Sequence, residues 1–163
     1  MILVMVGNHY KSFDRLLMKM DEIASHMHHD ILIQRGYSKY VPQNAKYFDF
    51  VPMKEAIEFM KMSELIVSHA GFGTILLCKE YGIPLLIFPR RKKYGEHGTD
   101  HQVEIAKALE ERNDNNVFVV YEENQLEDKI REILESPKKF APAENIGRRN
   151  LIRVIRTFIE RNG

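Results

Sequence analysis

The sequence has little of several features that define special classes of protein. It contains one cysteine, Cys78, among 163 residues. A single cysteine excludes an internal disulfide framework and is compatible with a reducing compartment. No apolar run approaches the roughly 20 residues that a membrane-spanning helix needs, so we expect membrane association to be peripheral or through a partner.

Excess charge of one sign is also missing. The formal net charge is +1, which gives no global electrostatic reason to expect nucleic acid as a partner. The amino terminus carries no basic leader, and its apolar run at residues 2–6 is too short for a signal peptide. We therefore interpret that run as the first strand of a soluble domain.

Two common nucleotide-binding motifs are missing as well. The segment after the first apolar run has one glycine, Gly7, followed by Asn8, where a dinucleotide fingerprint has three. No Walker A loop is present. Both absences weaken a nicotinamide dehydrogenase or P-loop NTPase interpretation.

Apolar runs alternate with helix-period segments along the chain. This alternation predicts successive β-α units and a parallel sheet. The fold class we expect is α/β: a Rossmann-like, doubly wound parallel sheet of about six strands. Strands are predicted at 2–6, 31–34, 47–51, 65–67, 85–88 and 117–120, and helices at 13–27, 52–62, 73–81, 99–112 and 124–135.

The length suits one domain, which we place at residues 1–140. Beyond a proline-containing break, residues 141–163 have the pattern of an amphipathic helix with a basic face. We expect that helix to pack on its own domain or on a partner, and docking to an anionic membrane surface is the other interpretation.

Two turns from strand to helix contain small residues. One holds Gly7 and Asn8, and the other holds Gly71 and Gly73 just before a helical pattern. Both turns leave a parallel sheet at the same edge, where ligands bind. Because a glycine lets a phosphate approach the amides of a helix start, we predict a diphosphate site there, whereas glycines that merely tighten turns are the alternative.

Histidines and cations near that edge are further candidates. His69 and His97 follow strands that should end side by side, and a histidine there can donate to a phosphate oxygen. Arg90 begins a cationic run, at 90–93, that either is solvated or contacts a diphosphate, a sugar carboxylate or a membrane phosphate. Asp100 either caps a helix or binds the ligand, and Gln102 can form hydrogen bonds with sugar hydroxyls.

Metal binding has weak support in the sequence. His26, His28 and His29 cluster near a helix end, but no cysteine or ordered set of carboxylates accompanies them. We interpret them as surface residues and infer no metal requirement and no cofactor.

The motifs at 68–74, 82–84 and 96–102 resemble the C-terminal domain of family 28 glycosyltransferases. Together with residues 4–16, they make the chain similar to stand-alone members of that family. These include the catalytic subunit of the dolichol-pathway GlcNAc transferase and PssE-type subunits of exopolysaccharide glucuronosyltransferases. The resemblance extends to about residue 135.

This resemblance implies the C-terminal half of a GT-B enzyme that is split between two polypeptides. The uracil would lie at Phe50 and Val51, the diphosphate at the turn from Gly71, and His69 would stabilise the leaving group as the catalytic candidate. The residues expected to bind the nucleotide sugar are Gly7, Asn8, Phe50, Val51, His69, Gly71, Phe72, Gly73, Thr74, Arg90, His97, Asp100 and Gln102.

One position departs from the family pattern. Relatives place a glutamate for the ribose hydroxyls where this chain has Leu77. Either the ribose is bound differently or donor affinity is weakened. Asn8, where relatives commonly have threonine, is a milder change.

The resemblance implies a membrane-anchored partner subunit that binds the acceptor. It also implies a UDP-sugar donor that carries GlcNAc or glucuronate, and a lipid-linked acceptor. It also implies a cytoplasmic protein recruited to the membrane by that partner, and we expect that the isolated chain can form homo-oligomers. A non-catalytic UDP-sugar-binding or scaffold subunit is the alternative from another class.

Overall fold

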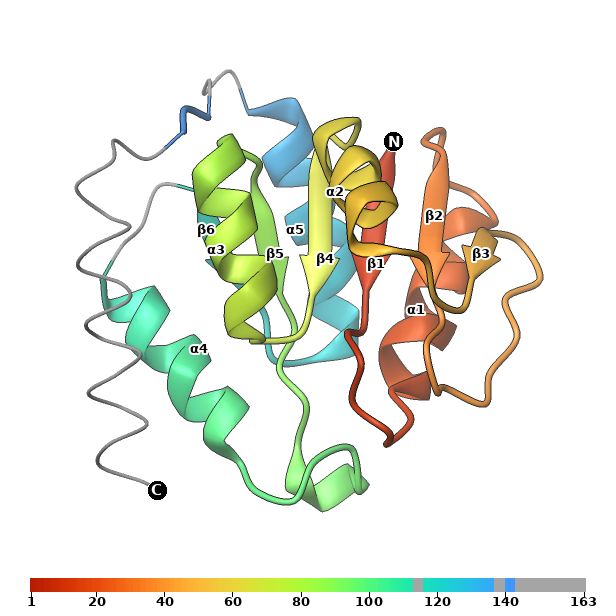
Figure 1. The fold of residues 1–163 in the computed structure, drawn as a ribbon, viewed down its shortest axis with the longest axis vertical. Coiled ribbons are helices and arrows are strands. Elements are labelled where there is room, and N and C mark those ends of the chain that lie inside the picture. Colours follow the sequence, from red (N-terminus) through yellow and green to blue (C-terminus); the bar gives the residue numbers. More distant parts are fainter. Residues whose placement is uncertain (113–115, 137–139, 143–163) are drawn as a thin grey trace.

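The described residues form a six-stranded parallel sheet in the order β3-β2-β1-β4-β5-β6 (Figure 1). The computed structural model describes residues 1–112, 116–136 and 140–142. The strands are β1 (Ile2–Met5), β2 (Ile31–Gln34), β3 (Lys46–Phe48), β4 (Leu65–Ser68), β5 (Leu85–Ile87) and β6 (Val117–Val119). The helices are α1 (Asp14–Ala24), α2 (Met53–Lys61), α3 (Phe72–Tyr81), α4 (His101–Glu111) and α5 (Leu126–Glu135), with short 3₁₀ turns η1 (Lys92–Tyr94) and η2 (Glu123–Gln125).

The predicted fold class is confirmed: each predicted strand and helix within the described residues is present, with ends that differ by a few residues. The end of α3 follows its sequence signal closely, because Gly82 adopts a left-handed φ of 67° at the C-cap. The turn η1 overlaps the end of the cationic run at 90–93 and was not predicted. The helix predicted at 141–163 falls almost entirely outside the described residues.

Both faces of the sheet are buried, and this accounts for the continuous apolar runs of the strands. In β1, Ile2 and Val4 contribute to one core cluster while Leu3 contributes to the other. The same alternation recurs in β4, where Val67 and Ile66 lie on opposite faces. Successive side chains of a strand point to opposite faces, so each central strand supports both cores.

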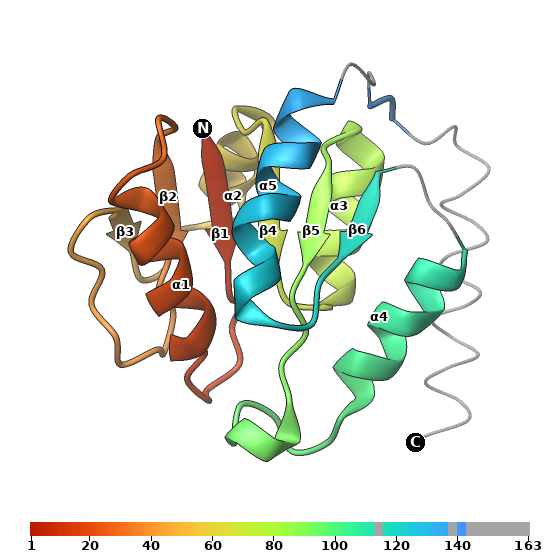
Figure 2. The same cartoon turned by 180° about the vertical axis from the view of Figure 1, so that it is seen from behind.

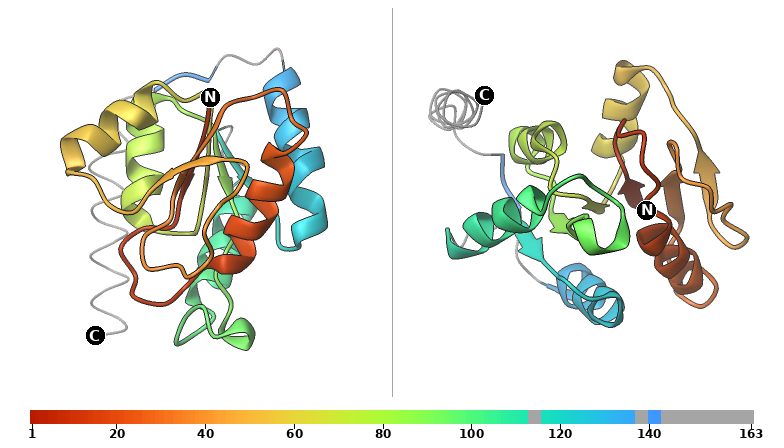
Figure 3. Two further views of the ribbon diagram at one scale, coloured as in Figure 1. Left: turned by 90° about the vertical axis from the view of Figure 1, so that its right-hand side faces the viewer. Right: turned by 90° about the horizontal axis from the view of Figure 1, so that it is seen from below.

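The helices divide between these faces. The helices α1 and α5 cover the first core, and α2, α3 and α4 cover the second (Figures 2 and 3). The strand β1 lies at the centre of the sheet, where Ile2 aligns with Ile31 on one side and with Leu65 on the other. The loops after β1 and β4 therefore emerge next to each other.

No helix in the described part of the chain is long and apolar enough to cross a membrane.

The long connection between β2 and β3 is fixed by one buried carboxylate. Asp21 of α1 is 1% exposed. Its oxygens accept hydrogen bonds from the backbone N–H groups of Gln43, Asn44 and Ala45 at 2.8 Å each, and from the Tyr40 hydroxyl at 2.7 Å. Burial opposes ionisation, but these donors outweigh it and lower the pKa of Asp21.

We expect Asp21→Asn to lower the free energy of unfolding by about 2–4 kcal/mol, because an amide cannot accept all of these bonds. Because folding lowers the pKa of Asp21, its carboxylate contributes its full stabilisation at pH values above the ordinary pKa of aspartate. That stabilisation is lost as the pH falls through the pKa of Asp21 in the folded state. Urea unfolding in neutral and in acid buffer measures both effects. Glu22→Gln, at the exposed neighbouring residue, is the control, and its free energy of unfolding should change by no more than about 0.5 kcal/mol. An equal loss of stability in both variants would contradict this account, and so would a loss for Asp21→Asn that persists in acid.

Candidate functional site

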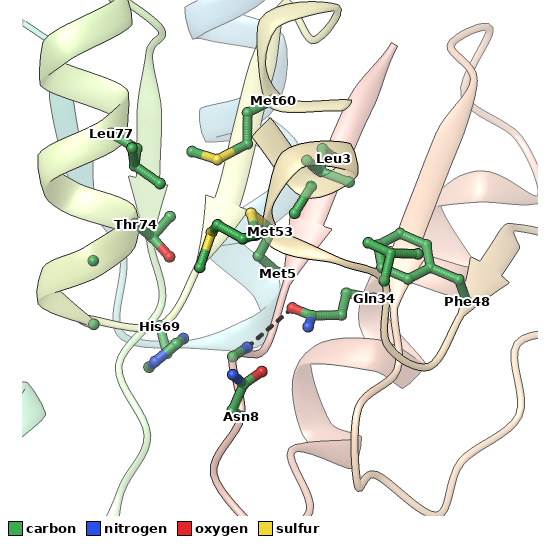
Figure 4. A pocket seen from close by; sticks show the side chains of 15 residues that line it. Leu3, Met5, Asn8, Gln34, Phe48, Met53, Met60, His69, Thr74 and Leu77 are labelled. Carbon is green, nitrogen blue, oxygen red and sulfur yellow. Dashed lines mark hydrogen bonds between the residues drawn. The ribbon is translucent and has the colours of Figure 1, made fainter. Parts of the chain in front are cut away.

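A cavity of about 440 Å³ lies where the strand order reverses, between β1 and β4, beneath α2 and beside α3 (Figure 4). In open α/β sheets ligands bind at such a reversal, at the carboxyl ends of the strands. The cavity is lined by Leu3, Met5, Gly7, Asn8, Gln34, Phe48, Val51, Met53, Ala56, Met60, His69, Gly71, Gly73, Thr74 and Leu77.

Two glycines let the loops after β1 and β4 close around one imidazole ring. Gly7 has a φ of 71°, and a Cβ atom there would lie 2.6 Å from Cε1 of His69. A Cβ atom on Gly71 would also collide with the His69 ring. A side chain at either glycine would displace the His69 ring, which lies between the two loops at the polar end of the cavity.

The His69 ring is neutral in the free protein. Burial is the main cause that lowers its pKa from 6.5 to about 4, and the positive charge of Arg90 adds to the shift. One ring nitrogen, Nδ1, lies 3.3 Å from the Ser68 hydroxyl. At neutral pH, His69 is thus a neutral imidazole with a single N–H, which is free for a ligand in the tautomer that carries the proton on Nε2.

Arg90 holds the loops after β1 and β5 together. Its guanidinium donates to the carbonyl oxygens of Val6, Lys11, Ser12 and Glu96 over 2.9–3.2 Å. The residue is fully buried, and burial lowers its pKa to about 10. Arg90 therefore stays charged at neutral pH and contributes a positive field at this end of the cavity.

A second arginine fixes the loop after β5. Arg15 of α1 forms a two-pronged ion pair with Glu96, with Nε–Oε1 at 2.8 Å and Nη2–Oε2 at 2.9 Å. Glu96 also accepts the backbone N–H of Arg91 at 2.9 Å, and the Arg15 guanidinium lies 4.1 Å from the centre of the Phe88 ring. These contacts make the segment 89–97 a packed structure.

The start of α3 supplies the donors that face the cavity. Amides in the first turn of a helix have no partner within the helix, and Gly71 has no side chain to cap them. Gly73 and Thr74 of this turn line the cavity. On the opposite side, the Gln34 amide oxygen accepts the N–H of Gly7 at 3.2 Å and so orients the loop after β1 (Figure 4).

Seven of the predicted binding residues meet in this cavity, and six do not. Gly7, Asn8, Val51, His69, Gly71, Gly73 and Thr74 line it, whereas Phe50, Phe72, Arg90, His97, Asp100 and Gln102 are not among its lining residues. Phe50 is 46% exposed, and its ring lies 4.9 Å from that of Tyr37. Phe72 lies in the first turn of α3.

Residues after β5 bond with their own loop. The Gln102 side-chain oxygen accepts the backbone N–H of Arg90 at 3.1 Å, and an Asp100 oxygen accepts that of Lys92 at 2.9 Å. Asp100 sits at the N-cap of α4 without a side-chain capping bond. The His97 ring lies 5.0 Å from the His9 ring, outside the cavity lining.

Half of the cationic run is solvated, as one interpretation predicted, and the other half bonds with the protein itself. Arg90 is buried on backbone carbonyls, and Arg91 reaches the Tyr121 carbonyl at 2.7 Å and Glu122 at 3.0 Å. Only Lys92 and Lys93 are exposed. The run is therefore half internal scaffold and half solvated surface.

Sequence reasoning missed the apolar wall and Gln34. The missed residues of the wall are Leu3, Met5, Phe48, Met53, Ala56 and Met60, and Leu77, which the family resemblance had already singled out, completes it. Gln34 carried a usable signal, because it is the polar last residue of an otherwise apolar strand that ends at the binding edge. The apolar residues had none, since they resemble ordinary core positions.

Among the described residues, no group of three or more histidine, cysteine, aspartate or glutamate side chains is arranged to hold a metal ion. His26 instead lies 3.0 Å from a Glu127 oxygen.

The model of the glycosyltransferase family 28 C-terminal domain matches residues 1–154. The chain therefore belongs to family 28. The predicted resemblance to the C-terminal domain of this family is confirmed. None of the curated proteins matches the sequence significantly.

Solved GT-B glycosyltransferases share the fold of this family 28 domain. The spinosyn forosaminyltransferase SpnP matches with a TM-score of 0.60 and 18% identity, over 83% of this chain and 35% of its own. The glycotransferase of kitacinnamycin gives 0.59 and 17%, over 83% and 35%. MurG of Acinetobacter baumannii gives 0.54 and 19%, over 82% and 42%. The chain thus spans well under half of each of these enzymes.

We expect Gly7→Ala to lower the free energy of unfolding by about 2 kcal/mol, through left-handed strain and the collision with His69. Gly95→Ala is the matched control, because Gly95 has the same φ of 71° but a Cβ atom there meets nothing within 4 Å, so that variant should lose only the roughly 1 kcal/mol of left-handed strain. Thermal or urea unfolding gives both values. Equal stability of the two variants would show that the His69 ring does not need the space above Gly7.

Proposed function

We propose that this chain is the donor-binding subunit of a two-component glycosyltransferase. It would move a hexose derivative, GlcNAc or glucuronate, from a UDP-sugar to a lipid-linked acceptor in polysaccharide or glycolipid synthesis. The observation that carries the proposal is the cavity at the strand reversal, where Gly73 and Thr74 of α3 meet His69. The two-component part rests on the resemblance of residues 4–16 and of the motifs at 68–74, 82–84 and 96–102 to stand-alone members of the family.

The proposed chemistry is an inverting displacement. The acceptor hydroxyl attacks the anomeric carbon, the bond from that carbon to the diphosphate oxygen breaks, and the electron pair leaves with UDP. The first-turn amides of α3 and the neutral N–H of His69 would donate to the departing diphosphate. Buried Arg90 adds a favourable field without touching the ligand.

The acceptor's proton would pass to a base on the partner subunit. We further propose that the partner is anchored in the membrane and brings this chain to the cytoplasmic face, and that the transfer needs no metal ion. The residues of this chain that would contact the donor are the lining residues Asn8, Val51, His69, Gly73 and Thr74.

A non-catalytic sugar-nucleotide-binding or scaffold subunit is the second candidate. It is favoured by Leu77, because the cavity offers an apolar side chain where a carboxylate would bind the ribose hydroxyls. A scaffold of this kind would bind the donor weakly and leave the transfer to another chain.

Calorimetry against UDP, UDP-GlcNAc, UDP-glucuronate and NAD tests the binding, and a transfer assay with the partner subunit and a lipid-linked acceptor separates the two candidates. We expect UDP and one UDP-sugar to bind, NAD not to bind, and sugar release only when partner and acceptor are both present. Selective NAD binding would refute the donor assignment. Donor binding in a complex whose transfer rate survives His69→Phe in this chain would favour the scaffold.

A further inference from the structure

The middle turn of α3 has no polar side. It holds four apolar residues in succession, Ile75 to Cys78, and successive residues of a helix point about 100° apart. Ile75 and Cys78 are buried in the second core, and Leu77 lines the cavity. Leu76 points to the remaining side and, within the described residues, packs on neither core. A helix that is apolar all round is normally covered, so we expect another segment on the side of Leu76.

The chain leaves the described region at the end of this same helix. Beyond α5, Phe140 packs against the first core. The Asn116 side chain donates to the Ala141 carbonyl oxygen at 3.1 Å. Pro142 then lies against Gly82, the C-cap of α3, where a Cβ atom would come within 2.5 Å of the Pro142 nitrogen. These contacts carry the chain from the face of the sheet covered by α5 to the face covered by α3 (Figures 1 and 2).

The sequence that follows has an apolar stripe of the kind that such a surface needs. Within the C-terminal segment (residues 143–163), the apolar residues recur at the spacing of one helix face; they are Leu151, Ile152, Ile155, Phe158 and Ile159. A helix of this length extends about 30 Å, against about 15 Å for α3. A helix that starts beyond Pro142 and runs back along α3 is therefore long enough to cover it.

We propose that the C-terminal segment of this chain docks along α3 through that stripe, on the side of α3 that carries Leu76. The contacts at Gly82 favour this occupant over a second copy or a partner subunit, because they tether the segment beside the surface at an effective concentration of roughly millimolar. The docked segment would support the helix whose first turn lines the cavity. This docking is independent of the proposed function, because it involves no ligand.

Ile152→Asp in the full chain tests the docking. A carboxylate in the stripe loses its water when the segment docks, so we expect the midpoint of thermal unfolding to fall by about 4–8 °C. Asn150→Asp is the matched control, because it adds the same charge two residues away, on the opposite side of the predicted helix. Its midpoint should shift by no more than about 1 °C.

The oligomeric state separates the possible occupants of the surface. Docking within the chain predicts a monomer by light scattering, and a loss for Ile152→Asp that does not depend on protein concentration. A dimer in which the loss depends on concentration would assign the stripe to a second copy and overturn the proposal. An unchanged midpoint for Ile152→Asp would leave the stripe to a partner subunit and overturn it as well.

A double variant locates the contact on α3. Leu76→Asp should lower the midpoint about as much as Ile152→Asp, and the double variant should lose little more than either, because one charge already removes the docking. Met18→Asp is the control for location, since Met18 is 54% exposed on α1, at the other face of the sheet. Its shift should add to that of Ile152→Asp. Fully additive losses for Leu76→Asp and Ile152→Asp would place the segment elsewhere and refute the proposal.

Discussion

The buried guanidinium of Arg90 is the interaction on which the shape of the site depends. It joins the carbonyls of Val6, Lys11 and Ser12, in the loop after β1, to the Glu96 carbonyl in the loop after β5. Carbonyls buried without a donor are costly, so the charge stabilises a loop arrangement that backbone pairing alone does not satisfy. With that loop fixed, Gly7 meets the His69 ring and the cavity keeps its polar end.

The same arrangement governs the electrostatics of the cavity. Its lining is uncharged, yet Arg90 contributes to the lowered pKa of His69. A positive field without a positive lining residue suits an anion that must be bound and later released, because no direct ion pair has to be broken. The first-turn amides of α3 act in the same sense, as oriented dipoles at a helix start. The donor site we propose thus depends on neutral groups, with a single charge placed behind them.

Much of the fold could be predicted from the sequence. Continuous apolar runs such as residues 65–67 mark strands that are buried on both faces, and Gly82 marks the end of α3. Gly71 and Gly73 also indicated where the cavity lies, because small residues between a strand and a helix are a local pattern that can be read from the sequence. Arg90 and Gln102 were predicted to bind the donor, but their burial depends on loops distant in the sequence, which no local pattern encodes.

The central claim is that the first-turn amides of α3 are directed at a pyrophosphate, and a crystal structure of the chain with UDP tests it most directly. The account predicts phosphate oxygens within hydrogen-bond distance of the Gly73 and Thr74 N–H groups. A nucleotide bound elsewhere on the molecule, or a cavity filled by the protein's own side chains at saturating UDP, would contradict it.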